Sequence, residues 1–142
     1  MRDSAPINVA CLILMDTTGA ILATRRPRHK TLGGLWEFPG GKLDPGETAE
    51  TALRREIREE LQLELGALIP LGPVVHRYEF GTIRLLPFLS HCHTRPRLQP
   101  TEHEEVCWVS LTEAKQLTWT PADVPILGLL NTLDANSCLS RL

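Results

Sequence analysis

The sequence has little of several features that would point to other classes of protein. It contains only four cysteines, and their scattered positions suggest neither a disulfide framework nor a zinc site. The formal net charge is −2, and no dense basic run is interleaved with aromatic residues, so a general nucleic-acid-binding surface is not expected. The apolar run at residues 7–15 is too short to span a membrane, and no clear cleavage site follows it. We therefore expect reduced thiols, a cytoplasmic location, and neither a membrane nor a stably bound nucleic acid as partner.

The size of the chain indicates one folding unit. A chain of 142 residues, of which 42% are hydrophobic, can build one core but not two. No internal repeat and no low-complexity linker interrupts it. We expect a single domain over residues 1–142, as a monomer or a homodimer.

Hydrophobic patterning predicts both strands and helices, and therefore an α+β fold. Residues 7–15 and 20–24 flank an Asp-Thr-Thr-Gly turn and predict a β-hairpin near the N-terminus. Ser110 and Glu113 have capping-box spacing, which predicts a short helix through about Leu117. The other predicted elements are strands at 71–80, 82–92 and 105–109, a short apolar segment at 35–38, a helix at 122–133, and a frayed tail from 134.

A helix predicted at residues 48–61 carries an apolar stripe with a cluster of acids beside it. The stripe consists of residues spaced four apart, which would face the core: Ala49, Leu53, Ile57 and Leu61. Glu56, Glu59 and Glu60 would project from neighbouring rows of one face. Such acids repel one another unless a cation lies between them, and Mg²⁺ or Mn²⁺ is the natural occupant. An ordinary solvated, charged helix is the alternative interpretation.

The segment before this helix favours the metal interpretation. Phe38-Pro39-Gly40-Gly41 brings two glycines to a place where backbone can approach a ligand closely. Asp44-Pro45-Gly46-Glu47 then forms a turn that leads into the helix.

Together these residues resemble the box of the Nudix hydrolases, G-x5-E-x7-R-E-U-x-E-E-x-G-U, in which U is a bulky aliphatic residue. The matching residues are Gly41, Glu47, Arg55, Glu56, Ile57, Glu59, Glu60 and Leu63. Gln62 departs from the pattern, because the family usually has glycine there. If Gln62 adopts a left-handed capping conformation, it should cost roughly 1 kcal/mol. Alternatively, the helix continues and ends near Gly66.

The resemblance implies the Nudix fold, a mixed β-sheet sandwiched between helices, with the box as a loop–helix–loop. It implies cleavage of a nucleoside diphosphate linked to a group X, with Mg²⁺, or Mn²⁺ as a substitute. It implies that Glu56, Glu59, Glu60 and the Gly41 carbonyl bind metal. Arg55 would hold a carboxylate in place through a bidentate pair. The base that accepts the proton of water would be Glu56 or Glu102, which precedes Trp108 by six residues as in MutT-like members. Glu104 and Glu105 are rivals to Glu102, which could also be an ordinary loop acid.

Three further residues resemble substrate-binding positions of MutT-like and CTP-pyrophosphohydrolase-like members. Arg26 would contact phosphate. Asp123 lies in a Pro-Ala-Asx-x-Pro segment that lines the base pocket in such enzymes, although it could instead cap a helix. Phe38 or Trp36 could pack against the base, or could belong to the core.

The resemblance favours hydrolysis of nucleoside triphosphates, ordinary or oxidised, to a monophosphate and pyrophosphate. CTP, dCTP and 8-oxo-dGTP are the candidate substrates, which would make the protein an enzyme of nucleotide-pool sanitation and DNA repair. One alternative is a pyrophosphatase acting on coenzyme A or another nucleoside diphosphate derivative. A non-catalytic nucleotide-binding Nudix module is a further alternative.

Overall fold

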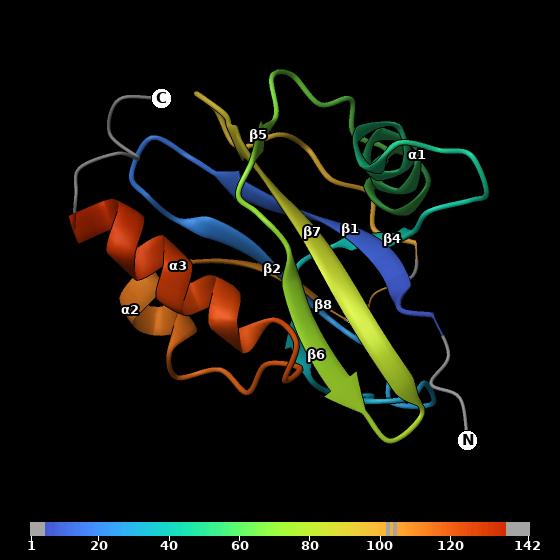
Figure 1. The fold of residues 1–142 in the computed structure, drawn as a ribbon. Coiled ribbons are helices and arrows are strands. Elements are labelled where there is room, and N and C mark those ends of the chain that lie inside the picture. Colours follow the sequence, from blue (N-terminus) through green and yellow to red (C-terminus); the bar gives the residue numbers. More distant parts are fainter. Residues whose placement is uncertain (1–4, 102, 104, 136–142) are drawn as a thin grey trace.

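The computed structural model describes residues 5–101, 103 and 105–135. An eight-stranded mixed sheet lies between helix α1 (Ala49–Leu61) on one face and helices α2 (Leu111–Ala114) and α3 (Val124–Ala135) on the other (Figure 1). This arrangement confirms the predicted α+β class and the sheet sandwiched between helices.

The sheet is built around strand β1 (Ile7–Met15), which has neighbours along both of its edges. β1 runs parallel to β7 (Gly81–His91) over its whole length, from the pair Ile7 and Ile83 to the pair Met15 and His91. Its other edge pairs antiparallel with β4 (Gly40–Lys42). The remaining strands are β2 (Ile21–Arg25), β3 (Trp36–Glu37), β5 (Ile69–Pro70), β6 (Val74–Tyr78) and β8 (Glu105–Val109).

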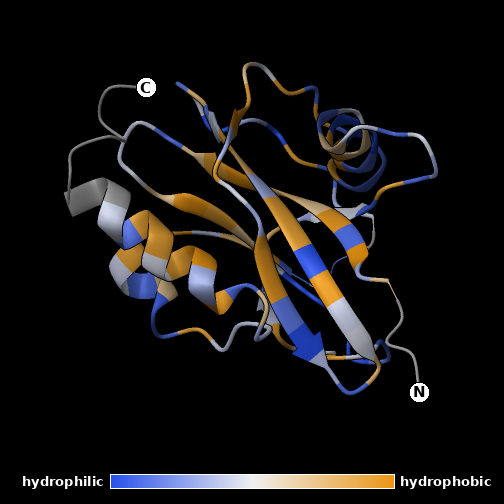
Figure 2. Ribbon diagram, viewed as in Figure 1, coloured by the Kyte–Doolittle hydropathy of each residue, from blue (hydrophilic) through white to orange (hydrophobic). Residues whose placement is uncertain are grey.

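Alternate residues of β1 supply the two halves of the core. Ile13 and Met15 belong to the cluster that includes α3, whereas Leu12 and Leu14 belong to the cluster that includes α1. This follows from the two-residue period of a strand, which sends successive side chains to opposite faces. Figure 2 shows hydrophobic residues along β1, β7 and α3, whereas α1 is largely hydrophilic. The predicted stripe on α1 is confirmed, since Leu53, Ile57 and Leu61 are buried and Ala49 is partly buried against the same cluster.

The predicted N-terminal hairpin is confirmed, although its ladder is short. β1 and β2 are antiparallel neighbours paired at Met15 and Ile21, and the rest of β1 pairs with β7 and β4. β2 pairs over its full length with β8. Local sequence shows which segments are extended, but it does not show which partner a strand buried on both faces will take.

Other differences concern the ends of elements. The predicted strand at 71–80 is shorter in the structure, where only β6 lies within that range. β5 comes before the range and was not predicted, and Gly72, with a φ of 93°, interrupts the extended backbone between β5 and β6. β4, at the glycine pair, was not predicted. The capping box of Ser110 and Glu113 is present, but α2 ends at Ala114 rather than near Leu117. α3 reaches Ala135, and the frayed tail predicted from residue 134 lies largely outside the described residues.

The end of α1 settles the two alternatives for Gln62. The helix stops at Leu61, and Gln62 takes the left-handed conformation, with φ 58° and ψ 39°. Its backbone N–H donates to the Arg58 carbonyl at 3.1 Å. The helix therefore keeps the capping geometry for which glycine is best suited.

Gln62→Gly should raise the free energy of unfolding by about 1 kcal/mol, because it removes the penalty of a side chain in the left-handed region. Urea unfolding followed by circular dichroism measures the change. Glu50→Gly, in the first turn of the same helix, is the matched control and should destabilise by about 1 kcal/mol. An unchanged or lower stability for the Gln62 variant would contradict the account.

Candidate active site

A cavity of about 810 Å³ brings the box together with segments distant from it in sequence. One part of its lining, the box wall, consists of Gly40, Gly41, Lys42, Glu56 and Glu60. A second part, the Asp123 wall, consists of Phe38, Tyr78, Thr120, Ala122 and Asp123. The loop after β2 adds Arg26 and Lys30. A volume of this size is in the range of cavities that hold small-molecule ligands.

Gly41 and Glu56 form the tightest contact in the box wall. The pairing of β4 with β1 carries Gly41 to the side of α1. A Cβ atom on Gly41 would lie 2.3 Å from the Glu56 Cδ and 2.4 Å from its Oε2. No residue other than glycine therefore leaves room for the Glu56 carboxylate as it stands. The Glu56 carboxylate therefore lies directly against the backbone of Gly41. The carboxylate and the backbone carbonyl are both oxygen ligands, which hard cations such as Mg²⁺ and Mn²⁺ prefer.

Arg55 holds this part of the site in place. Its Nε and Nη2 donate to the two carboxylate oxygens of Glu47 at 2.9 and 2.8 Å, and its Nη1 donates to Glu56 Oε1 at 2.8 Å. The Glu47 contact is a bidentate pair of the predicted kind, made from the loop before the helix. These hydrogen bonds lower the pKa of Glu47 to about 2. Arg55 thus links the loop to the helix and orients Glu56.

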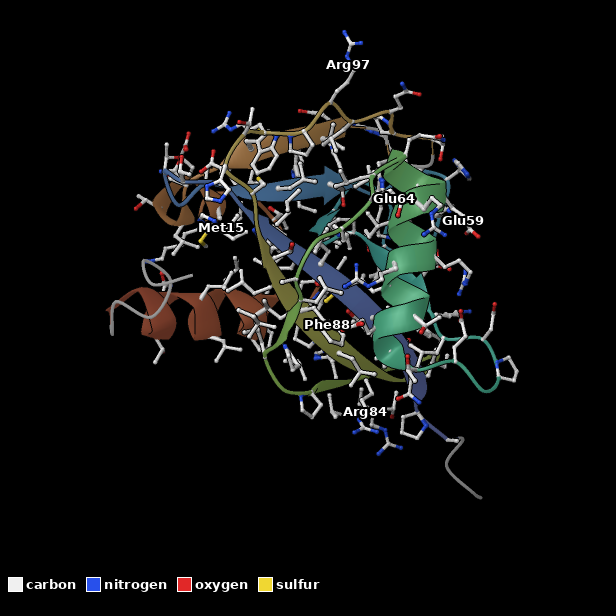
Figure 3. The ribbon with its side chains drawn as sticks, turned by 90° about the horizontal axis from the view of Figure 1, so that it is seen from above. Met15, Glu59, Glu64, Arg84, Phe88 and Arg97 are labelled. Carbon is white, nitrogen blue, oxygen red and sulfur yellow. The ribbon has the colours of Figure 1, made fainter. Side chains whose placement is uncertain are left out.

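The three box acids, Glu56, Glu59 and Glu60, do not all point into the cavity. Glu56 and Glu60 line the cavity with side chains 17% and 5% exposed. Glu59 is 56% exposed, lies 3.5 Å from Arg55, and is on the outer side of α1 in Figure 3. A step of four residues turns roughly 40° around a helix, whereas a step of three turns roughly 60° the other way. In the part of the chain that the structure describes, no three metal-ligating side chains form a ready group.

Asp123 immediately precedes α3, yet its carboxyl group faces the cavity. It is 5% exposed and accepts a hydrogen bond from the Thr120 hydroxyl and another from the backbone of Phe38. Burial raises its pKa to about 7, and the nearby Glu37 carboxylate adds to the rise. The Asp123 carboxyl group thus lies in the cavity wall, where it could accept hydrogen bonds from a bound ligand.

The aromatic residues predicted near the site are mostly core. Phe38 is 3% exposed and its ring lies 4.7 Å from that of Trp119. Trp36 is buried as well, and only Phe38 of the two lines the cavity. Core packing is therefore the main use of both side chains.

Arg26 lines the cavity, and its guanidinium group also contacts two neighbouring residues of the protein. Its Nη1 lies 3.2 Å from Glu37 Oε1, and its Nε donates to the Thr31 carbonyl at 2.8 Å. Burial raises the pKa of Glu37, although the Arg26 charge works against that rise. Glu102, the candidate base, lies outside the described residues.

Several cavity residues were not predicted from the sequence: Lys30, Tyr78, Phe80 and Thr120. Lys30 is exposed, and it reaches the cavity from a compact loop in which Gly33 N–H donates to the Lys30 carbonyl. Tyr78 is the last residue of β6 and Phe80 lies in the turn that follows, where their two rings stack with centroids 4.9 Å apart. His103, which follows Glu102, also lines the cavity, and burial lowers its pKa to about 4.

The fold and the box wall define a class: a mixed sheet between helices, with a loop and an acidic helix on one face, is the Nudix fold. The sequence profile of the NUDIX domain matches residues 5–130. The chain is 37% identical over 130 residues to the CTP pyrophosphohydrolase of Escherichia coli, covering 89% of this chain and 92% of that protein. It is 36% identical over 89 residues to the 8-oxo-dGTP diphosphatase of Proteus vulgaris, covering 63% of this chain and 80% of that protein.

Among solved structures, the solution structure of the E. coli ORF135 protein is similar with a TM-score of 0.79 and 35% identity, covering 92% of this chain and 91% of that one. The chain belongs to the NUDIX domain family, and it is a Nudix hydrolase. Enzymes of this family generally use a divalent metal ion. None of the helices within the described ranges is long and apolar enough to cross a membrane.

Proposed function

We propose that this protein hydrolyses nucleoside triphosphates to a nucleoside monophosphate and pyrophosphate, and so clears unwanted nucleotides from the pool. One observation carries the proposal: a single nucleotide-sized cavity joins the acidic box wall to the Asp123 wall. The acidic box wall can bind a polyphosphate through a cation. The Asp123 wall, with its aromatic side chains and a carboxyl group, can bind a nucleobase. The names of the relatives support substrates such as CTP and 8-oxo-dGTP.

Mg²⁺ is the proposed cofactor, with Mn²⁺ as a substitute. The donor set fits, because the Glu56 carboxylate lies against the backbone of Gly41 and Glu60 lines the same wall. Glu56, Glu60 and the Gly41 carbonyl would hold the cation, and Glu59 would join after turning inward from solvent. The chemistry that a divalent cation supplies when bound is neutralisation of phosphate charge and activation of water.

The remaining residues would bind and orient the substrate. Arg26, Lys30 and Lys42 line the cavity and would contribute positive charge to the phosphates. Arg55 does not line the cavity, so it would act indirectly, by holding the Glu56 carboxylate in its orientation. The proton of the attacking water would pass to Glu102 or Glu56. We place the reaction on free nucleotides in the cytoplasm, carried out by a monomer or homodimer.

Incubation of the purified protein with Mg²⁺ and a nucleotide panel tests the proposal. The panel contains CTP, dCTP, dGTP and 8-oxo-dGTP, with coenzyme A and ADP-ribose as competing substrate classes, and products are resolved by ion-exchange chromatography. Release of pyrophosphate and a nucleoside monophosphate is expected. Release of orthophosphate, cleavage of coenzyme A alone, or binding without cleavage would reject the proposal.

Asp123→Ala should change the ranking of these four triphosphates by about tenfold or more, because a buried acceptor that meets a base edge discriminates strongly between hydrogen-bonding patterns. Values of kcat/KM for each nucleotide measure the ranking. Asp123→Asn is the matched control, since it keeps the volume and replaces one acceptor with a donor, so it should shift the ranking differently. A uniform loss for all four nucleotides would assign Asp123 a structural role instead.

A further inference from the structure

His103 is a buried histidine of the cavity wall to which the proposed reaction gives no role. Its side chain is 6% exposed, and it lines the same cavity as Arg26 and Glu37. The chain just before it is anchored to the last turn of α1, because Thr101 N–H donates to the Glu60 carbonyl at 3.0 Å. The imidazole ring therefore has a defined place in the wall.

The surroundings of the His103 ring indicate which of its nitrogens carries the proton. Nδ1 is buried and has no hydrogen-bond partner among the described residues, whereas Nε2 lies 3.9 Å from Glu37 Oε2. Burial, with the positive charges of Lys30 and Arg26, lowers the pKa of His103 to about 4, so the ring is neutral and holds one proton. On Nε2 that proton faces a carboxylate, whereas on Nδ1 it would be a buried donor without an acceptor. The ring thus presents its N–H to Glu37.

The Glu37 carboxylate lies between His103 and Arg26. Arg26 Nη1 is 3.2 and 3.3 Å from the two carboxylate oxygens, and the Glu37 side chain is only 19% exposed. If Arg26 turns toward a phosphate, this carboxylate loses its main partner, and a buried charge without a partner is strongly unfavourable. A shift of about 1 Å would bring the Nε2–H of His103 within hydrogen-bond distance of Glu37.

We propose that His103 is a positioning residue for phosphate binding: its Nε2–H takes over the Glu37 carboxylate and so frees the Arg26 guanidinium for the triphosphate. This inference rests on the phosphate contact that the proposed function assigns to Arg26. His103 itself touches neither the phosphates nor the reacting atoms. Its contribution passes through Arg26, and this separates it from a direct contact with substrate.

The affinity for inorganic tripolyphosphate tests this role, because that ligand has no base and its binding is measured without nucleotide cleavage. His103→Ala should raise the Kd, obtained by isothermal titration calorimetry in the presence of Mg²⁺, by about tenfold, since a charge-assisted hydrogen bond is lost. Arg26→Ala removes the residue through which His103 acts. Adding His103→Ala to that variant should therefore change the Kd by less than about twofold.

Two amide variants show which ring nitrogen matters. His103→Gln places an amide N–H near the position of Nε2 and should keep the Kd within about threefold of the parent value. His103→Asn places its amide near the position of Nδ1, which has no partner, and should lose as much affinity as His103→Ala. Thermal unfolding of all variants shows whether the fold is kept.

His29→Ala is the matched control. His29 is exposed in the loop after β2 and is not part of the cavity lining, so its replacement should leave the Kd unchanged. An unchanged Kd in His103→Ala, the full loss repeated in the Arg26→Ala background, or equal affinities of the Gln and Asn variants would overturn the role of His103. So would a parent protein that does not bind tripolyphosphate.

These outcomes are distinct from a failure of the proposed function, which depends on the release of pyrophosphate from the nucleotide panel. A parent protein that shows the expected coupling between His103 and Arg26 but cleaves no nucleotide would reject the proposed function, while the role of His103 in phosphate binding would stand.

Discussion

Replacing Glu56 or Glu60 with glutamine is expected to lower turnover about a hundredfold or more, because each variant keeps the shape of the side chain but loses a negative charge that would hold a divalent cation. Both side chains line the cavity, and Glu60 is only 5% exposed. The measurement is kcat for pyrophosphate release at saturating Mg²⁺ and nucleotide. Raising the Mg²⁺ concentration should restore part of the activity if cation affinity is what the variants lose.

Glu50→Gln is the control for this pair. Glu50 is on the same helix, 55% exposed and 3.6 Å from Arg54, and it does not line the cavity. Its replacement removes the same charge from α1, so a general electrostatic effect would appear in all three variants. Activity of the Glu56 and Glu60 variants within a few-fold of the parent would remove the basis of the metal proposal. Glu59→Gln then shows whether the outward acid takes part.

The second large effect is expected from Gly41→Ala. The added methyl group would fall 2.3 Å from the Glu56 Cδ, so the carboxylate must move away. A displacement of about 1 Å in a catalytic group can cost about a hundredfold in rate. The atoms that must move are the far end of a flexible side chain, so the fold should be retained. We expect a drop in kcat of that order with a nearly unchanged melting temperature.

Two other glycines make this prediction specific. Gly66→Ala adds a methyl group where no heavy atom lies within 4 Å, so it should alter neither activity nor stability. Gly40→Ala would place its methyl group 1.9 Å from the Ala10 carbonyl oxygen, on backbone that cannot move aside, so it should destabilise the protein itself. Full activity of Gly41→Ala would show that the close contact with Glu56 has no part in catalysis.

The local features of the box were predictable because they depend on residues near one another in the chain. The helix and its buried stripe follow from apolar residues at four-residue spacing, whereas the sequence left the end of the helix open until the structure showed Gln62 in the left-handed conformation. The bidentate pair of Arg55 and Glu47 spans only one loop and two turns of helix. The distinction between Glu59 and Glu60 was not predicted, because side chains 100° apart on a helix look equivalent until something covers one of them.

The positions of the cavity residues outside the box depend on long-range pairing. β1 joins β7 rather than β2 along its length, and this pairing brings the turn with Phe80 into the cavity. A strand buried on both faces has apolar residues throughout, so its sequence does not favour one neighbour over another. For the same reason, the sequence showed that Tyr78 and Phe80 are two residues apart but not that they line a cavity.

By itself, the sequence determined the α+β class, the helix of the box and the family, because each is specified by residue types at short, regular spacing. The tertiary structure alone decided which acids reach the cavity, that Gly41 presses against Glu56, and that an aromatic stack stands beside Asp123. Those relations depend on a cavity whose lining joins residues as far apart in sequence as Ile7 and Asp123, 116 positions, and they arise only when the sheet assembles and buries its two faces.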